Sequence, residues 1–337
     1  MRRIRLNFAN LQISFADRDS ALKRVEEWVD GGTYPVQVVY GPEGCGKTAW
    51  LLQSVELLRE LGFDVIYVNP LNKLIMAEFS IEDLRDRFLR LVEESIRQNA
   101  LAKIAWIAYD IAYELIKATR GKVAIIVDDV FQVIGIKESA MYVKALLNLI
   151  EYPPEHYERI ITIAATSESS SKSEIGRHRW ANLLTMWNMT KEGFKQLYEQ
   201  LPGEKPGFEE VWEITGGNPW VLESLHRLRW NVEELLKEIT TRKNLDIFIS
   251  SLSLSDKEIL TKALDDPDIL MSREGIPLMD RLIELNLIIN IPQWRDEHLW
   301  IDQPPPEKDL ELGIGKYVAW QSPLYKEAVR RAINRLM

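Results

Sequence analysis

The sequence is almost free of cysteine and histidine: Cys45 is the single cysteine among 337 residues, beside 4 histidines. One cysteine cannot form an intramolecular disulfide, and no Cys/His grouping has the spacing of a zinc site. No uninterrupted apolar run reaches the roughly 18 residues that span a bilayer. The N-terminal stretch MRRIRLNFANLQIS lacks the continuous apolar segment of a secretory signal. We therefore expect a cytoplasmic protein with no membrane partner.

Positive charge is also in deficit, because 42 Lys and Arg face 51 Asp and Glu, a net charge of −9. A negative field repels phosphate, so a protein coated in nucleic acid is not favoured, although a local basic patch stays open. The 46% hydrophobic and 28% charged residues are ordinary globular usage, which excludes disorder and collagen-like repeats. At about 150 residues per domain, the length allows two or three domains.

Short apolar runs alternate with helical patterns in the first half of the chain, which is the βαβ signature of a parallel sheet covered on both faces. The runs are bounded by polar, Gly or Pro residues, as buried parallel strands are. Five strands are predicted, at residues 36–40, 64–69, 122–128, 159–165 and 183–188. The pattern predicts an α/β core over residues 1–189.

Helical periodicity continues for about fifty residues between the second and third predicted strands, which is too long for one crossover helix. We expect two helices at 80–98 and 100–119, with Ser80 as N-cap and Asp83 three residues on. This helical insertion, at about 80–119, offers a surface for a partner.

The pattern changes to helices alone over residues 190–244, which we interpret as a helical lid. In residues 245–337, Ser255 and Glu258 form an expected capping box for a helix through Leu264. A helix at 275–286, a strand LIINI, a long polar hairpin, a strand at 316–320 and a last helix opened by Pro323 follow. This order predicts a winged-helix-like C-terminal domain.

The strongest motif is Gly41-Pro42-Glu43-Gly44-Cys45-Gly46-Lys47-Thr48, which fits the phosphate-loop pattern G-x-x-x-x-G-K-[ST]. It follows a predicted strand and precedes a predicted helix at 47–60. Its glycines let consecutive backbone N–H groups curl around a β-phosphate, and the positive end of the helix faces the same charge. We expect residues Gly41 through Ala49 to contact a nucleotide, with Lys47 on the β- and γ-phosphates and Thr48 on Mg²⁺. Cys45 is interpreted as a small spacer.

A Mg²⁺ site beside such a loop needs an acid at the end of a buried strand, and Asp128 follows the run VAIIV. Asp129 comes next and is placed to orient or deprotonate the attacking water. Thr166 and Ser167 end the following strand, where a hydroxyl reaches the γ-phosphate or that water; the alternative is the polar start of a loop.

With these motifs in this order, the sequence resembles the archaeal ATPase family within the STAND branch of P-loop NTPases. That family is related to AAA+ proteins and to archaeal origin-recognition initiators. The segment FADRDSAL at 15–22 resembles the family motif D-R-[ED]-x-E-L near the adenine and ribose, with Ala21 in place of the usual Glu. The resemblance implies that Arg18 contacts the nucleotide. TGGNP at 215–219 resembles the G-x-P element of the lid, which implies that Pro219 packs beside the base.

The resemblance implies a five-stranded P-loop core, a helical lid and a winged helix that bind ATP or ADP with Mg²⁺. Asp129 stands where AAA+ engines usually have Glu, which favours slow or switch-like hydrolysis. Ser167 stands where many STAND proteins carry Arg. The nearest arginines are Arg177 and Arg179. They are either arginine fingers, which contact the γ-phosphate bound by a neighbouring copy, or surface residues paired with an acid.

Our leading hypothesis is a Mg²⁺-dependent, ATP-hydrolysing switch whose nucleotide state biases the lid and the winged helix, with a protein partner or self-association. The alternative is an ATP-gated DNA-binding initiator or regulator. Charge does not favour it, because residues 245–337 hold 11 Lys and Arg against 16 Asp and Glu, and only the last helix is basic. A kinase-like phosphotransferase ranks last, since no acceptor pocket is apparent.

Overall fold

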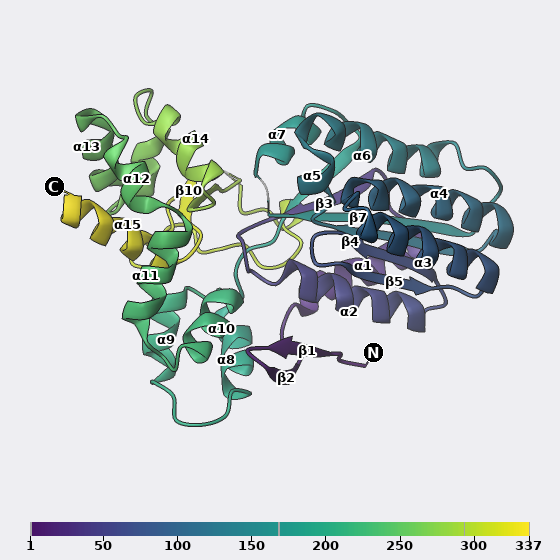
Figure 1. Ribbon diagram of the computed structural model, residues 1–337, viewed down its shortest axis with the longest axis horizontal. Coiled ribbons are helices and arrows are strands. Elements are labelled where there is room, and N and C mark those ends of the chain that lie inside the picture. The colour runs from purple at the N-terminus through teal and green to yellow at the C-terminus, as the bar shows by residue number, and fades with distance from the viewer. Residues whose placement is uncertain (1, 168, 293, 337) are drawn as a thin grey trace. The chain divides into compact units, whose positions relative to one another are not determined.

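The computed structural model describes residues 2–167, 169–292 and 294–336 (Figure 1). The chain forms two compact units, each assembled from segments that are distant in sequence. The first unit holds the residues up to Ile4, Asp19–Tyr40 and Lys47–Thr185. The second holds Arg5–Arg18, Gly41–Gly46 and the residues from Met186 onward. The domain boundaries expected after residues 189 and 244 stay a prediction.

A six-stranded sheet with the order β5-β4-β6-β7-β3-β8 forms the centre of the first unit. Five of these strands run parallel, and β5 pairs antiparallel with β4. The bounds are β3 Val36–Tyr40, β4 Asp64–Asn69, β5 Leu74–Glu78, β6 Lys122–Asp128, β7 Arg159–Thr166 and β8 Ala181–Thr185. The α/β fold with a mostly parallel sheet is therefore confirmed.

Three strands of this sheet differ from the prediction. The fourth predicted strand, 159–165, continues one residue further, through Thr166, as β7. The fifth predicted strand, 183–188, begins two residues earlier, because β8 pairs with β3 from Val36 opposite Ala181 to Tyr40 opposite Thr185. The antiparallel β5 was not predicted. Its residues are exposed or half-buried at a sheet edge. The run LIMAE contains a single β-branched residue, Ile75, so its composition indicates a strand only weakly.

Helices cover both faces of this sheet (Figure 1). On one face lie α1 (Asp19–Gly31) and α2 (Lys47–Glu60), and α2 packs on β4, β6 and β7. On the other face lie α4 (Leu101–Thr119) and α6 (Ile136–Glu151). The remaining helices of this unit are α3 (Glu82–Arg97), α5 (Val130–Ile134) and α7 (Ser169–Gly176).

The expected insertion of two helices is present as α3 and α4, which pack on each other. Phe88 of α3 and Ile104 of α4 are fully buried in the core that these helices share with the sheet. The predicted N-cap at Ser80 is wrong, since Ile81 occupies that position without a side-chain cap. The backbone N–H of Ser80 instead donates to the Asp64 carboxylate, 3.2 Å away.

The second unit begins with a small hairpin that was not predicted, β1 (Arg5–Phe8) and β2 (Leu11–Ser14). Its turn residues Ala9 and Asn10 have φ of 47° and 65°, as a two-residue turn between antiparallel strands requires. Alanine is a poor indicator of such a turn, which is why the sequence pattern did not predict it. Phe8 and Ile13 pack with α8 (Lys191–Glu199) and α9 (Phe208–Thr215) in one apolar cluster.

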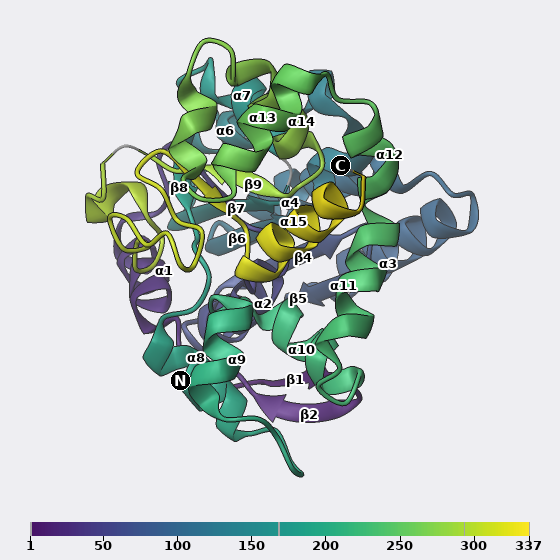
Figure 2. The same cartoon turned by 90° about the vertical axis from the view of Figure 1, so that its left-hand side faces the viewer.

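A second apolar cluster in this unit joins the helices that follow. Figure 2 shows α15 beside α11 and α12, against which it packs. The bounds are α10 Pro219–Arg227, α11 Val232–Arg242, α12 Leu245–Ser250, α13 Leu254–Ala263, η1 Pro267–Met271, α14 Ile276–Glu284, β9 Ile288–Asn290, η2 Glu297–Leu299, β10 Val318–Trp320 and α15 Pro323–Leu336. The capping box of α13 is formed by Ser253 and Asp256, two residues earlier than predicted.

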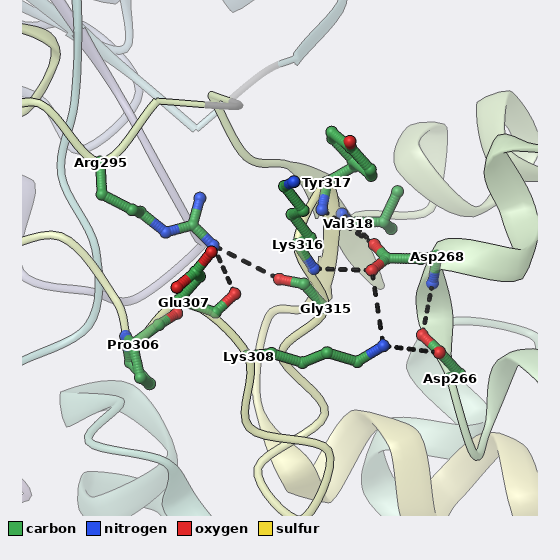
Figure 3. Close-up of polar contacts among 10 residues, drawn as sticks. All are labelled: Asp266, Asp268, Arg295, Pro306, Glu307, Lys308, Gly315, Lys316, Tyr317 and Val318. Atoms are coloured by element: carbon green, nitrogen blue, oxygen red, sulfur yellow. Dashed lines mark hydrogen bonds and ion pairs between the residues drawn. The ribbon is translucent and has the colours of Figure 1, made fainter.

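The arm between β9 and β10, described over residues 291–292 and 294–317, contains little regular structure and is fixed by polar contacts (Figure 3). The carboxylate of Asp268 accepts hydrogen bonds from the backbone N–H groups of Lys316, Tyr317 and Val318 at 2.7, 2.8 and 3.1 Å. Arg295 donates to the carbonyl oxygen of Pro292 at 2.9 Å. The element order agrees with the expected C-terminal outline, while its identification as a winged helix stays a prediction. Among the described residues, no helix is long and apolar enough to cross a bilayer.

Candidate functional site

Polar side chains from α2, β4 and β6 converge on one carboxylate in the first unit. Asp128 ends β6, and its Oδ2 accepts hydrogen bonds from Thr48 Oγ1 at 2.7 Å, Asn69 Nδ2 at 2.9 Å and the Tyr67 hydroxyl at 3.0 Å. Parallel strands place their carboxyl ends at one edge of the sheet, which explains why Asn69 and Asp128 meet. The two predicted Mg²⁺ ligands, Thr48 and Asp128, are thus neighbours.

Burial dominates the electrostatics of this cluster. Asp128 is 1% exposed, and desolvation raises its pKa, while the hydrogen bonds from Thr48, Asn69 and Tyr67 and the charge of Lys47 oppose the rise. The Tyr67 hydroxyl has a raised pKa for the same reason and stays a donor. The described residues contain no group of three His, Cys, Asp or Glu that would hold a metal by themselves. A carboxylate and a hydroxyl fit Mg²⁺, which completes its shell with phosphate oxygens and water.

The other predicted catalytic residues of this unit lie at the same ends of the strands. Asp129 follows β6 with φ of 51°, and its backbone N–H donates to the carbonyl of Ala165 at 2.9 Å. Thr166 is fully buried at the end of β7. Ser167 Oγ accepts a hydrogen bond from Gln132 Nε2 of α5 at 3.3 Å.

Lys47 is the first residue of α2 and is 6% exposed, and Ala49 lies in the same first turn. Arg177 and Arg179 are exposed residues between α7 and β8. Arg177 forms an ion pair with Glu174 at 2.8 Å, three residues earlier. This ion pair agrees with the interpretation of Arg177 as a surface residue paired with an acid. Whether Arg177 or Arg179 contacts the γ-phosphate of a neighbouring copy is a question for experiment.

The first six residues of the phosphate loop, Gly41–Gly46, belong to the second unit, and close packing there explains Gly41 and Gly44. A Cβ on Gly41 would lie 2.0 Å from the carbonyl oxygen of Met186. A Cβ on Gly44 would lie 2.2 Å from Trp220 Cβ, and the φ of Gly44 is +75°. Cys45 is fully buried, with Sγ 3.9 Å from the Met186 carbonyl oxygen, which agrees with a spacer role.

The helices of the second unit also contact this loop through polar groups. Asn218 Nδ2 donates to the Glu43 carbonyl at 3.0 Å, and its Oδ1 caps α10 at the N–H of Val221. Lys243 forms an ion pair with the Glu43 carboxylate at 2.9 Å. The Glu43 N–H donates to Gln321 Oε1 at 2.8 Å. Pro219 begins α10 as predicted, and its Cγ would lie 3.9 Å from a Cβ on Gly46.

Arg18, expected near the adenine and ribose, has a guanidinium that contacts protein groups. Nη1 donates to Asp302 at 2.7 Å, and Nη2 donates to the carbonyl oxygens of Cys45 at 2.6 Å and Trp187 at 2.8 Å. Both charged side chains are 3% exposed. Arg18 and the preceding Asp17 have φ of 64° and 61°, an uncommon backbone conformation that directs the arginine to these acceptors.

Several residues of these clusters were missed by sequence reasoning. Asn69 carried a usable signal, because it ends an apolar strand just as Asp128 does. Gln132, Lys243, Gln321 and Asp302 carried none, since each reaches its partner through tertiary packing.

The sheet, the phosphate-loop sequence and the acid that ends β6 together define an α/β protein of the P-loop class. The sequence model of a protein family, described as an ATPase domain predominantly from Archaea, matches residues 15–225. The chain therefore belongs to this family. No curated protein matches the sequence.

Solved structures with similarity to this chain include replication initiators. The Aeropyrum pernix ORC2 protein, in ADPNP and ADP complexes, is 13% identical over 93% of this chain and 94% of its own, with a TM-score of 0.40. The Aeropyrum pernix ORC1 protein in complex with DNA is 16% identical over 96% and 95%, with a TM-score of 0.38. AMPPCP-bound DnaA from Aquifex aeolicus is 16% identical over 78% and 81%, with a TM-score of 0.38. At TM-scores below 0.5, these likenesses carry no argument about function.

Proposed function

We propose that this protein is a Mg²⁺-dependent, ATP-binding and ATP-hydrolysing switch of the STAND type. One observation carries the proposal: the hydroxyl of Thr48, the last residue of the phosphate-loop motif, lies 2.7 Å from the buried carboxylate of Asp128. A phosphate loop and a strand-end acid joined in this way form the metal-binding half of a nucleoside triphosphate site. Membership of the archaeal ATPase family agrees with this assignment.

In the proposed site, the backbone of Gly41–Gly46 and the side chain of Lys47 bind the phosphates. Thr48 and Asp128 hold Mg²⁺, which neutralises charge on the phosphate oxygens when bound. Asp129 orients the attacking water and accepts its proton, and Thr166 or Ser167 contacts that water or the γ-phosphate.

The phosphate-loop assignment is tested by nucleotide binding and phosphate release, with fluorescent ADP and with ATP. Lys47→Ala should abolish nucleotide binding, whereas Lys117→Ala, the same change at an exposed lysine of α4, should leave binding unchanged. Lys47→Ala that binds as tightly as wild type would contradict the assignment.

Asp128→Asn keeps the size of the side chain and one acceptor oxygen for its three donors, while it removes the negative charge and replaces the second oxygen with an amide. We expect this variant to lose the dependence of ATP affinity on Mg²⁺ concentration. Asp129→Asn should keep nucleotide binding but lower the rate of phosphate release by about 10²- to 10⁴-fold, the range for a general base. Unchanged Mg²⁺ dependence in Asp128→Asn excludes the proposed metal site.

The switch part of the proposal is that the γ-phosphate biases the position of the lid and of the winged-helix-like region, and that a protein partner or a second copy reads this position. Light scattering during turnover tests self-association. Release that rises with protein concentration and is lost in Arg177→Ala/Arg179→Ala supports a finger supplied by a neighbour. Tight ATP binding with background release and monomeric mass supports a switch that waits for a partner.

DNA binding is not part of the proposal, because the basic residues of α15 are engaged within the second unit. Lys326 is 9% exposed and donates to the carbonyls of Leu310 and Glu311, each at 2.9 Å. Burial lowers the pKa of Lys326, so this residue does not offer a solvated charge. Arg331 contacts Glu327 and Glu233. Retention of duplex, forked or single-stranded DNA in 50 mM salt would restore the DNA-binding alternative.

A further inference from the structure

Three consecutive carbonyl groups of the phosphate loop are held by donors of the second unit. The Glu43 carbonyl accepts from Asn218 Nδ2 at 3.0 Å, the Gly44 carbonyl from the Trp220 backbone N–H at 3.2 Å, and the Cys45 carbonyl from Arg18 Nη2 at 2.6 Å. The loop is therefore fixed peptide by peptide by its surroundings.

The direction of each carbonyl also sets the direction of the next N–H. In a trans peptide the C=O and the following N–H point to opposite sides, and the cis bond among the described residues is elsewhere, at Tyr34–Pro35. The N–H of Cys45 is already used within the loop, because it donates to the Pro42 carbonyl at 3.3 Å. The Arg18 bond on the Cys45 carbonyl turns the N–H of the same peptide, that of Gly46, to the opposite side. Backbone N–H groups of a turn that point outward in this way bind anions.

Of the three donors, the one that bonds to the Cys45 carbonyl, Arg18, carries a charge. The Arg18 side chain is 3% exposed, a place where an unpaired cation is costly, and Asp302 supplies the opposite charge at 2.7 Å. Asp302 lies in the arm between β9 and β10, 284 residues from Arg18. With Nη1 fixed by Asp302, the planar guanidinium directs Nη2 to the Cys45 and Trp187 carbonyls at 2.6 and 2.8 Å.

We propose that Asp302 is a positioning residue for nucleotide binding, which acts through Arg18 to hold the Cys45 peptide in its phosphate-binding orientation. Arg18 then acts on the backbone of the loop rather than on the base. The inference rests on the proposed function, since it assumes that the loop binds a nucleotide. Because coupling between two sites is reciprocal, bound nucleotide also strengthens the docking of the arm.

The experiment measures the Kd of fluorescent ADP, with the melting temperature recorded for each variant. Asp302→Asn removes the charge at constant size and should weaken binding by about ten- to hundredfold, the value of one charge-assisted hydrogen bond. Lys308→Gln is the control, because it breaks the exposed ion pair with Asp266 in the same arm and should leave the Kd unchanged.

Asp302→Asn leaves a buried arginine unpaired, so a second variant separates folding from positioning. Arg18→Gln/Asp302→Asn buries no net charge and should recover the melting temperature while the Kd stays weakened. A purely structural role predicts that the Kd recovers together with the melting temperature, and that result would overturn the inference.

Two further outcomes are distinguishable. Wild-type protein that binds no nucleotide overturns the proposed function and this inference with it. Wild-type binding together with an unchanged Kd in folded Asp302→Asn overturns the inference alone. Hydrogen exchange of residues 294–317 should slow on addition of ADP in wild type, and less so in Asp302→Asn.

Discussion

Gly44→Ala tests whether the phosphate loop packs directly on the start of α10. Two costs follow from the structure. The φ of Gly44 is +75°, and an L-residue in the left-handed region costs about 1–2 kcal/mol. The added Cβ would also meet Trp220 Cβ at 2.2 Å, and relieving such a contact costs about 1–3 kcal/mol. The free energy of unfolding should therefore fall by about 2–5 kcal/mol.

A matched glycine in the same unit isolates the packing cost. Gly203 has φ of +84° with nothing within 4 Å of an added Cβ, so Gly203→Ala carries the backbone cost alone. At about 2–4 °C per kcal/mol for a unit of this size, the melting temperature of Gly44→Ala should drop by about 4–20 °C, and that of Gly203→Ala by about 2–8 °C.

Calorimetry and urea unfolding measure both variants, and the binding of fluorescent ADP is recorded in parallel. Nucleotide affinity should fall in Gly44→Ala and stay unchanged in Gly203→Ala, because only the first lies in the phosphate loop. Equal melting temperatures for the two variants would refute the reasoning, since they would mean that no side chain of α10 contacts the loop.

Three further predictions concern stability. Burial raises the pKa of Asp17 above its ordinary 3.8, so ionisation of this carboxyl lowers the free energy of unfolding as pH rises from 3.8 through the raised pKa. Asp17→Asn removes this cost, and asparagine suits the φ of 61°. The variant should be more stable than wild type above pH 3.8, as urea titrations from pH 4 to 7 will test. Asp268→Asn places an amide donor against the backbone N–H groups that the carboxylate accepts from, so the free energy of unfolding should fall by about 1–3 kcal/mol. Proteolysis in the arm should be faster than in wild type, and equal cleavage rates would contradict this prediction. Phe88→Ala should cost about 3–5 kcal/mol in denaturant unfolding, and a loss under 1 kcal/mol would mean that α3 is not packed on the core.

The sequence predicted best where the signal is local. The helix at 47–60 and the strands at 36–40, 64–69 and 122–128 have the predicted bounds, because buried parallel strands are continuous apolar runs between polar ends. Caps were predicted less well: Ser80 and Ser255 both carry the right spacing to an acid, yet α3 begins after Ile81 and α13 begins after Ser253. Tertiary packing decides which of several suitable residues begins a helix.

The sequence by itself determined the α/β class, the phosphate-loop motif and the acid at the end of β6, because each depends on residues that are adjacent in the chain or on the pattern of one strand. Only the tertiary structure decided that β5 completes the sheet edge, that Asn218 and Arg18 hold the carbonyls of the loop, and that Asp302 pairs with Arg18. These contacts join segments up to 284 residues apart. Their partners are chosen by burial, since a buried charge or carbonyl requires a donor or acceptor that no local pattern can specify.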